Sequence, residues 1–460
     1  MHIDKKDLEQ LFARQRNFFE PHQTKSIDFR LNALKKIRSL IKTCQPEIHQ
    51  ALKKDLGRSV LESVGGDTGL TLQELSLTIR KLRSWSRTRR TRTPLVMFNA
   101  RSYYSYEPYG NVLIISPWNY PFQLLFVPMT GAMAAGNCVI AKPSRHAAHT
   151  SELMIGMIAD HFDPDYISII PGSREINEYI LELPYDYIFF TGGQETGKKV
   201  MKAAAEHLTP VSLELGGKNP VIVDRNIHLR NTAKRILWGK FLNAGQSCVA
   251  PDYMLVHEDV KEDLLSLMKE YLVKWLGSNP ETSSDFSRII NTVEAERLEA
   301  YISQGRVIAG GSSDSEKKYI SFTLLDEVSQ NAPVLNEEIF GPILPVITYR
   351  DTGEAIRYVT SRPKPLSLYV FSTSRRFQKE VMKKTSSGNA CINETVVQFI
   401  NPRLPYGGVG TSGMGKYHGR FSFETFSNKR SFMNTSNLID LPVRYPPYKR
   451  NAKLISMLMR

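Results

Sequence analysis

Short runs of β-branched and aromatic residues alternate with helical patterns through most of this chain beyond residue 110. The first runs read NVLIIS, CVIAK, YISII and YIFFT, and helical stretches lie between them. A second set follows, with the runs VSLEL, PVIVD, YMLVH, ILPVITY and LSLYVFS and with helical patterns at 230–243 and 259–276. Strands that alternate with helices are typical of βαβ units. The sequence therefore predicts an α/β fold with doubly wound parallel sheets.

The length of 460 residues exceeds what one hydrophobic core usually serves, and the two rounds of strands predict two such domains. Most of the first hundred residues indicate amphipathic helices instead, as in IDFRLNALKKIRSLIKTC. The join between the two α/β domains is expected near Thr209-Pro210. Ligands of such sheets usually bind in a cleft, and the facing edges of the two sheets are expected to form it.

The cysteines and the apolar runs argue against several classes of protein. The four cysteines, at 44, 138, 248 and 391, form no CxxC pair and have no nearby histidine, which argues against a zinc site or a disulfide framework. We therefore expect a reducing cytoplasmic setting and no metal. The charged start MHIDKKDLEQLF lacks the apolar core of a signal peptide, so no export is expected. Pro, Gly and Asn interrupt the longest apolar stretch, 122–140, which favours a buried helix over a membrane span.

The net charge of +14 is concentrated in two stretches. Residues 80–101 hold eight Lys or Arg and no acid, and residues 416–460 hold nine Lys or Arg against two acids. Such patches attract nucleic acid, anionic lipid or a phosphorylated cofactor, although solvated faces and an exposed tail explain them more simply. Because no RNA-binding or helix-turn-helix pattern accompanies RSWSRTRRTR, we expect no nucleic-acid partner.

One cysteine stands in an unusual setting. Cys248 lies in NAGQSCVA, among Gly, Gln and Ser, although free cysteine usually behaves as a small buried hydrophobe. A helix is expected to end near Gly245 and the strand YMLVH follows, which places the thiol on a loop at a strand edge. A thiolate there can add to a carbonyl carbon. From this stretch alone, a reactive thiol and an inert thiol are equally supported.

Two further features predict what could surround such a thiol. In SLELGGKNP, Glu214 stands where a strand breaks at glycines, so its carboxylate could activate water against a thioester; a surface or helix-capping glutamate is the alternative. In YIFFTGGQETGKKV, Gly192, Gly193 and Gly197 lie between a strand and a helix, as in a phosphate-binding turn. The spacing is not GxGxxG, so this cofactor signal is weak by itself.

Five ordered motifs give the chain a family resemblance. SPWNYPF, LELGGK, GQSC, EEIFGP and LPYGGVGTSGMGKYHG, in this order and at these separations, resemble the NAD(P)-dependent aldehyde dehydrogenase superfamily over about residues 30–428. The length and the short N-terminus are most similar to its class 3 branch, which includes fatty-aldehyde enzymes, and similar bacterial enzymes act on carotenoid aldehydes. The resemblance implies the aldehyde dehydrogenase fold, with two doubly wound domains and a small bridging element, and a homodimer.

The resemblance also implies oxidation of an aldehyde to a carboxylic acid, with NAD or NADP as cofactor. It implies that Cys248 is the nucleophile, that Glu214 activates the hydrolytic water, and that the Asn119 side chain and the Cys248 N–H stabilise the oxyanion. Taken alone, Asn119 would be read as a turn residue. Retention of Glu214 favours hydrolysis over transfer to coenzyme A. Glu338 is a second carboxylate expected near the reacting centre, so the division of base work between the two glutamates stays open.

Cofactor ligands follow from the same resemblance. Lys142 is implied to bind a ribose hydroxyl and Glu338 the nicotinamide ribose, with Phe340 packed near the nicotinamide ring. The glycines from 192 to 197 are implied to face the pyrophosphate. Arg145 departs from the family pattern, which commonly has Glu there. Because glutamate accepts from the ribose 2′-OH whereas arginine pairs with a 2′-phosphate, NADP use is one expectation and a solvent-exposed arginine is the other.

The implied substrate pocket is mainly apolar and suits aromatic or medium-to-long aliphatic aldehydes. Its implied members are Tyr120, Ser247, Val396, Phe399, Ile400 and His418, of which His418 could instead be a packed bridging residue. The C-terminal stretch YPPYKRNAKLISMLMR is too short and basic to span a bilayer, but it could bind an anionic membrane surface. Two rival classes are a non-catalytic binding or structural protein on this fold and a basic nucleic-acid or membrane-surface binder.

Four regions are accordingly expected. Residues 1–208 would hold the N-terminal helices and the NAD(P)-binding domain, with about 85–107 contributing to the bridging element. Residues 209–400 would form the catalytic domain. Residues 401–430 would form a return segment with the rest of the bridging element, and 431–460 the basic tail.

Overall fold

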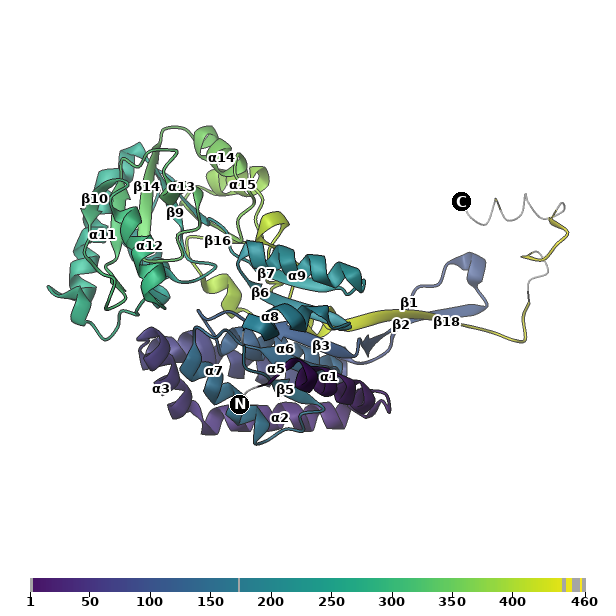
Figure 1. The fold of residues 1–460 in the computed structure, drawn as a ribbon. Coiled ribbons are helices and arrows are strands. Elements are labelled where there is room, and N and C mark those ends of the chain that lie inside the picture. Colours follow the sequence, from purple (N-terminus) through teal and green to yellow (C-terminus); the bar gives the residue numbers. More distant parts are fainter. Residues whose placement is uncertain (1–2, 173, 441–443, 449–455, 457–460) are drawn as a thin grey trace.

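The computed structural model of the protein describes residues 3–172, 174–440, 444–448 and 456. Two lobes lie one above the other in the view of Figure 1, and a narrow arm projects from the first lobe. Each lobe is built on a sheet whose strands are mostly parallel, of six strands in the first lobe and seven in the second. The α/β fold with parallel sheets that the sequence predicts is confirmed.

Helices form most of the first hundred residues, as the apolar spacing predicts. These are α1 (Lys5–Phe19), α2 (Ile27–Thr43), α3 (Gln45–Leu56), the short α4 (Val60–Ser63) and α5 (Gly69–Trp85). Side chains cap the N-termini of three of them: Asp4 accepts from the Asp7 N–H ahead of α1, Ser26 from the Phe29 N–H ahead of α2, and Ser59 from the Glu62 N–H ahead of α4. No helix within the described residues is both long enough and apolar enough to cross a membrane.

The sheet of the first lobe has the strand order β17-β7-β6-β3-β4-β5. Its strands are β3 (Asn111–Ile115), β4 (Cys138–Lys142), β5 (Ile167–Ile169), β6 (Tyr187–Gly192), β7 (Val211–Leu215) and β17 (Gly413–Met414). Five run parallel and β17 is antiparallel to β7. The assignment of VSLEL to the second set of strands was wrong, because this strand is β7 and pairs with β6. The division at 208 stays a prediction.

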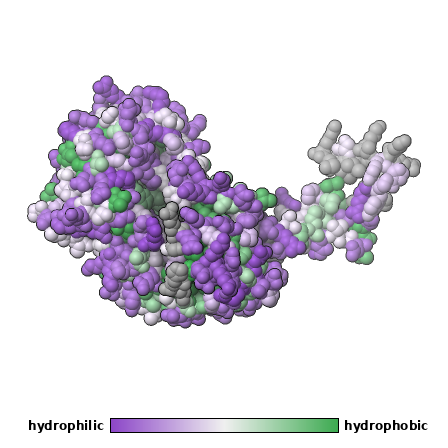
Figure 2. Space-filling view, viewed as in Figure 1, coloured by the Kyte–Doolittle hydropathy of each residue, from purple (hydrophilic) through white to green (hydrophobic). Residues whose placement is uncertain are grey.

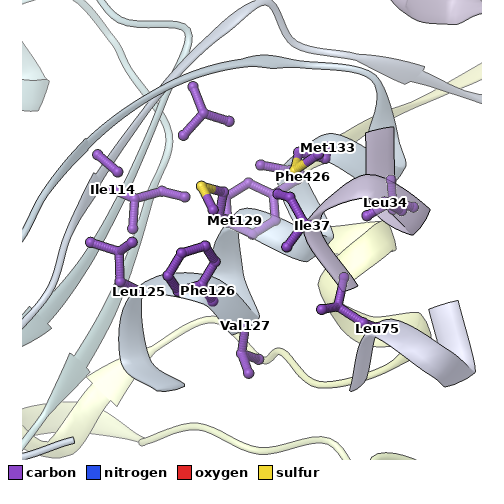
Figure 3. Packing of buried hydrophobic residues seen from close by; sticks show 14 of the residues in the cluster. Leu34, Ile37, Leu75, Ile114, Leu125, Phe126, Val127, Met129, Met133 and Phe426 are labelled. Carbon is purple, nitrogen blue, oxygen red and sulfur yellow. The ribbon is translucent and has the colours of Figure 1, made fainter. Parts of the chain in front are cut away.

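Helices cover both faces of this sheet. The connecting helices are α6 (Gln123–Ala135), α7 (Ala148–Ala159), α8 (Arg174–Tyr179) and α9 (Gln194–Glu206). Alternate residues of β3 point to opposite faces, so Val112 and Ile114 belong to one apolar cluster and Leu113 and Ile115 to another. Figure 3 shows α6 inside the first cluster, where Phe126 and Met129 lie among side chains from β3 and the N-terminal helices.

The sheet of the second lobe has the order β10-β13-β14-β9-β8-β15-β16. Its strands are β8 (Pro220–Val223), β9 (Tyr253–His257), β10 (Arg306–Ala309), β13 (Thr323–Asp326), β14 (Ile343–Tyr349), β15 (Ser367–Phe371) and β16 (Asn389–Ile392). A small hairpin joins β11 (Ser313–Asp314) to β12 (Tyr319–Ile320). The helices are α10 (Leu229–Phe241), α11 (Lys261–Leu276), α12 (Thr292–Ile302), α13 (Pro333–Asn336), α14 (Thr352–Thr360) and α15 (Arg375–Lys384). The two helices predicted at 230–243 and 259–276 are therefore confirmed, as α10 and α11.

The arm is a three-stranded antiparallel sheet in the order β1-β2-β18. Its strands are β1 (Arg89–Thr91), β2 (Ala100–Pro108) and β18 (Ser427–Thr435), and α16 (Arg420–Thr425) precedes β18. Residues 431–435, which the sequence analysis assigns to the tail, form the second half of β18 and pair with 100–104 of β2. Most of the tail beyond them, at 441–443, 449–455 and 457–460, lies outside the described residues.

Candidate active site

A cavity of about 560 Å³ lies at the carboxyl ends of β3, β4, β6 and β7, between the two lobes. This is the position at which parallel α/β sheets bind ligands. The first lobe contributes to its lining, among other residues, Asn119, Lys142, Arg145, Gly192, Gly193 and Glu214. The second lobe contributes Cys248, Glu338 and Phe340. The structure thus brings together nine residues that the sequence places far apart along the chain.

Cys248 lies on the loop between α10 and β9, as predicted, and its side chain is partly exposed to the cavity. The Asn219 side chain fixes this loop, because its Nδ2 donates to the Cys248 carbonyl at 2.7 Å and to the Ala250 carbonyl at 3.0 Å. Ahead of the loop, Asn243 and Ala244 take left-handed backbone conformations, with φ of 53° and 49°. Such conformations are uncommon outside glycine and turn the chain sharply out of α10.

Asn119 follows β3 and is buried beside the Cys248 loop. Its Nδ2 donates to the Gln246 carbonyl at 3.2 Å, and Asn243 Nδ2 donates to the Asn119 carbonyl at 2.9 Å. The guanidinium of Arg58, which is fully buried against Asp67, also donates to the Asn119 carbonyl. These contacts hold the side-chain amide of Asn119 next to the Cys248 loop. One of the two N–H bonds of its Nδ2 donates to Gln246, and the other takes no part in these contacts.

Glu214 lies near the end of β7 and is buried, and neither carboxylate oxygen has a hydrogen-bond partner within the described residues. Burial raises its pKa well above the ordinary value, and the charge of Lys416 opposes that rise. Lys416 is anchored nearby by the carbonyls of Gly388 and Gly408, each at 3.3 Å from its Nζ. A buried carboxylate without donors favours the protonated form and binds a proton strongly.

Glu338 also lines the cavity, and it lies in the loop after α13. Its carboxylate lies against Gly216, where a Cβ built on the glycine would come within 2.0 Å of Oε2, and the Gly217 N–H donates to it. Burial and the charge of Asp252 raise its pKa to about 8. Lys218 holds the same loop, because its Nζ donates to the Glu337 carbonyl at 2.6 Å.

The environment of the thiol raises its pKa. Burial is the main cause, the charges of Glu338 and Glu214 add to it, and the pKa of Cys248 reaches about 12. A hydrogen bond between Cys248 Sγ and Tyr406 Oη, at 3.5 Å, acts in the opposite direction. Sequence reasoning missed Tyr406, although it stands in the motif LPYGGVGTSGMGKYHG, because only the fold carries that loop back to the thiol.

The other half of the cavity fits a dinucleotide. Gly192 and Gly193 line it at the start of α9, and a Cβ built on Gly193 would meet nothing within 4 Å, so a ligand can approach the backbone. No side chain caps α9, which leaves the amide donors of its first turn available to an anion. Lys142 lines the same space, has no acidic partner within the described residues, and has a pKa lowered to about 8 by burial and by Arg145.

Two predicted cofactor residues differ in their surroundings. Gly197 does not line the cavity: a Cβ there would lie 2.7 Å from Leu215 Cδ2, so this glycine permits close packing of α9 on β7. The expectation that it faces a pyrophosphate was therefore wrong. Phe340 does line the cavity and packs edge-on against Trp118, with 5.4 Å between ring centroids. Trp118 was missed, although SPWNYPF contains it.

A second, much smaller cavity of about 20 Å³ lies on the other side of Cys248. Four of the six predicted substrate residues line it, namely Tyr120, Ser247, Phe399 and His418. Val396 and Ile400 do not line this cavity, so their place in the substrate pocket stays a prediction. Val396 is packed into the core of the first lobe and Ile400 is partly exposed, whereas Phe399, in the same turn η8 (Val397–Ile400) as Ile400, lines the cavity.

The comparisons with known proteins agree with this geometry. A model of the aldehyde dehydrogenase family matches residues 1–432. The chain belongs to that family. The 4,4'-diaponeurosporen-aldehyde dehydrogenase of Staphylococcus aureus is 44% identical to it over 450 residues, which cover 97% of this chain and 98% of that protein. Aldehyde dehydrogenase family 3 member B1 of Mus musculus is 41% identical over 455 residues, covering 98% of this chain and 97% of that protein.

A solved structure of Staphylococcus aureus AldH in a substrate-bound state is similar over 100% of both chains, with a TM-score of 0.97 and 43% identity. This aldehyde dehydrogenase therefore has the expected fold and oxidises aldehydes to acids with NAD or NADP. The family and enzyme class expected from the five motifs are confirmed. A non-catalytic protein on this fold is set aside.

Proposed function

We propose that this aldehyde dehydrogenase acts on apolar aldehydes, with Cys248 as nucleophile, Asn119 as oxyanion donor and Glu214 as hydrolytic base. The observation that carries the assignment is that these three groups line one cavity. The thiol is partly exposed there, the amide is held beside it, and the carboxylate is buried without a donor. A nucleophile, a positioned donor and a general base in one enclosed site are what acyl chemistry through a thioester requires.

The first bond forms when the Cys248 sulfur, after loss of its proton, adds to the aldehyde carbon. The resulting alkoxide lies within reach of the free N–H of Asn119 Nδ2 and of the Cys248 backbone N–H. A nicotinamide cofactor held by Lys142 and Glu338 would supply the acceptor for the hydride that leaves the former aldehyde carbon. Cys248 then carries a thioester, and Glu214 removes a proton from the water that attacks it. The acid leaves, and the electron pair of the broken C–S bond returns to sulfur.

Glu214 is better suited to the base role than Glu338. Both oxygens of Glu214 lack donors, whereas Glu338 already accepts from the Gly217 backbone and lies against Gly216. A carboxylate that accepts no hydrogen bond is the stronger base, because donors stabilise its charged form. We assign to Glu338 the binding of the nicotinamide ribose and to Lys142 that of the adenosine ribose.

Cofactor choice depends on Arg145 in this proposal. The side chain is exposed and lies at the border of the main cavity and a neighbouring one of about 590 Å³. No acidic residue pairs with it within the described residues, so its guanidinium is free to bind a 2′-phosphate. We therefore propose that NADP is accepted alongside NAD.

The substrate is proposed to be an aromatic or long-chain aldehyde, of which a polyene aldehyde is one type. Tyr120, Phe399 and His418 give the inner cavity an aromatic lining, and a relative 44% identical is named for a diaponeurosporen-aldehyde. The volume of about 20 Å³ is far below the roughly 300 Å³ typical of ligand pockets. A long chain therefore requires Phe399 and its turn to move outward.

A homodimer is proposed through the arm. Within the described residues, the edge of β18 that faces away from β2 has no partner strand, although the strand is nine residues long. Apolar side chains are exposed on the arm, and Figure 2 shows them as green patches on the projection. They are Leu95, Phe98, Phe432 and Met433. Unpaired edges with apolar neighbours favour pairing with a second chain, and a two-fold dimer is the commonest form.

Contact of the basic tail with an anionic membrane surface is a further proposal, since a lipid-soluble substrate would be found there. Truncation after Ser431 would cut through β18, so the matched variant ends after Thr435 and keeps the arm intact. Equal co-sedimentation of both forms with anionic vesicles would remove the tail from this role.

The experiment that tests the catalytic assignment follows the absorbance of reduced nicotinamide with NAD or NADP and a panel of benzaldehyde, hexanal, dodecanal and a polyene aldehyde. Cys248→Ala should produce no reduced cofactor. Glu214→Gln should produce a burst of one equivalent per active site followed by slow turnover, because oxidation precedes hydrolysis. Glu338→Gln is the matched control and should weaken cofactor binding without such a burst. Steady turnover by Cys248→Ala would contradict the proposal.

A further inference from the structure

The thiol of Cys248 has one hydroxyl neighbour that no catalytic role has yet used. The distance from Cys248 Sγ to Tyr406 Oη is 3.5 Å, and Tyr406 is buried. A buried phenol hydroxyl normally requires a hydrogen-bond partner, and within the described residues this hydroxyl has no other. The pair is therefore a direct contact between a phenol and the sulfur that reacts.

The fold holds the Tyr406 ring in place. Tyr406 and Tyr417 exchange backbone hydrogen bonds, with N–O distances of 3.1 Å and 2.8 Å. The ring packs edge-on against the rings of Tyr417 and His418, at centroid distances of 5.5 Å and 5.3 Å. With its backbone paired and its ring packed, the hydroxyl has little freedom to leave the sulfur.

We infer that Tyr406 is a catalytic residue that donates a hydrogen bond to the Cys248 thiolate, both before the thiolate attacks and when it is released from the thioester. A thiolate has no proton to give, so in that state the hydroxyl must be the donor. Hydrogen bonds to charged acceptors are stronger than those to neutral ones, so the contact favours the thiolate over the thiol. The inference rests on the proposed role of Cys248 as nucleophile.

Bond changes in these steps leave the tyrosine intact. On activation the S–H bond of Cys248 breaks and the proton passes to a carboxylate of the cavity or to water, while the Tyr406 O–H bond persists. On hydrolysis the C–S bond breaks and its electron pair goes to sulfur, which again accepts from Tyr406. No proton is transferred from the phenol, whose own pKa burial raises well above the ordinary value.

Other titratable groups around the sulfur do not take this role. They are Tyr120, Tyr417, His418, Glu214 and Glu338. The two carboxylates disfavour a nearby thiolate when they are charged, and neither of the two phenols is hydrogen-bonded to Sγ. His418 is buried and its pKa is lowered to about 4, so it stays neutral above pH 6. Tyr406 is thus the side chain that can offset the burial of the thiolate.

The test measures alkylation of Cys248 by iodoacetamide between pH 6 and 9 in the wild type, Tyr406→Phe and Tyr417→Phe, with Cys248→Ala to identify the labelled thiol. Loss of a hydrogen bond to the thiolate should raise the thiol pKa by about one unit, which lowers the fraction of thiolate about tenfold. The freed thiolate is more nucleophilic by roughly threefold. Tyr406→Phe should therefore react about threefold more slowly at each pH, while Tyr417→Phe follows the wild type.

Tyr406→Phe keeps the packed ring, so its melting temperature and its affinity for NAD and NADP should match the wild type. Alkylation at the wild-type rate in Tyr406→Phe would overturn the inference, and so would an equal slowing in Tyr417→Phe. These outcomes differ from failure of the proposed function, which would appear as aldehyde oxidation that persists in Cys248→Ala.

Discussion

At the scale of single residues, the active site consists of groups whose ordinary chemistry is altered by burial. Burial raises the pKa of the Cys248 thiol and of the Glu214 carboxyl, and it lowers the pKa of Lys142. The pKa of Glu214 lies well above 4.5, so its base form increases with pH through an interval above that value. Each of these side chains is common on protein surfaces, and its reactivity here follows from the cavity.

Arg145→Glu tests the choice of cofactor. The ratio of kcat/KM for NADP to that for NAD should fall about tenfold or more, because a charge-assisted hydrogen bond to the 2′-phosphate is replaced by repulsion. Lys198→Glu makes the same change of charge on an exposed face of α9, outside both neighbouring cavities, and should leave the ratio unchanged. An unaltered preference in Arg145→Glu would mean that the arginine is merely solvent-exposed.

At the scale of elements, helices from the N-terminal part support the catalytic loops. Arg58 lies between α3 and α4, and Asp67 lies in the π-helical turn η2 (Val64–Thr68). Their side chains are fully buried against each other, and Asp67 also accepts from the Gln123 N–H at 2.8 Å at the start of α6. Arg58 and Asp67 therefore hold the loop before α6 at two points, which are the Asn119 carbonyl and the Gln123 N–H.

Asp67→Asn should lower the free energy of unfolding by about 3–5 kcal/mol, since it leaves the Arg58 guanidinium buried without a counter-charge. Urea unfolding measures the change. Asp28→Asn breaks the exposed pair with Arg83, whose side chains are 75% and 63% accessible, and should change stability by less than about 1 kcal/mol. Similar losses of unfolding free energy in Asp67→Asn and Asp28→Asn would contradict the larger contribution of the buried ion pair.

Glu74, on α5, gives a prediction about pH. Its Oε1 accepts from the Gly419 N–H, and burial raises its pKa to about 7. Because the unfolded pKa is lower, near 4.3, the stability that Glu74 contributes is full below pH 4.3 and is lost as pH rises through 7. Glu74→Gln keeps the acceptor without the charge.

This variant should match the wild type below about pH 4 and exceed it at pH 8 by up to about 3.7 kcal/mol, because the folded and unfolded pKa values differ by roughly 2.7. Urea midpoints at several pH values follow the divergence. A gap that stays constant with pH would show that Glu74 does not titrate as described.

At the scale of the whole molecule, the arm is the part that a single chain leaves incomplete. The lobes bury their own apolar clusters, whereas β18 has one unpaired edge and β1 the other. Strand edges of this kind are normally covered, shortened or charged. Arginines flank the arm, and apolar side chains still remain exposed on it.

In the proposed homodimer, Met433→Asp should shift the protein from dimer towards monomer in sedimentation velocity, because it places a charge on the proposed interface strand, at a side chain that is 48% exposed in one chain. Val273→Asp adds the same charge to α11 in the second lobe, at a side chain 67% exposed, and should leave the mass unchanged. A wild type that sediments as a monomer at micromolar concentration would contradict the dimer.

The sequence by itself determined the parallel α/β fold and the helical N-terminal part, and its motifs, through the family resemblance, named nine residues of the cavity lining. Local patterns carry that information, because strand and helix periods are set by neighbours and motif residues such as Cys248 and Glu214 stand at element ends. Only the tertiary structure decided the rest. It placed β7 in the first sheet, packed Gly197 against Leu215, left Val396 and Ile400 outside the lining of the small cavity, and brought Tyr406 to the sulfur. These outcomes depend on packing between segments remote in the chain, and no local pattern records which neighbour a residue will meet.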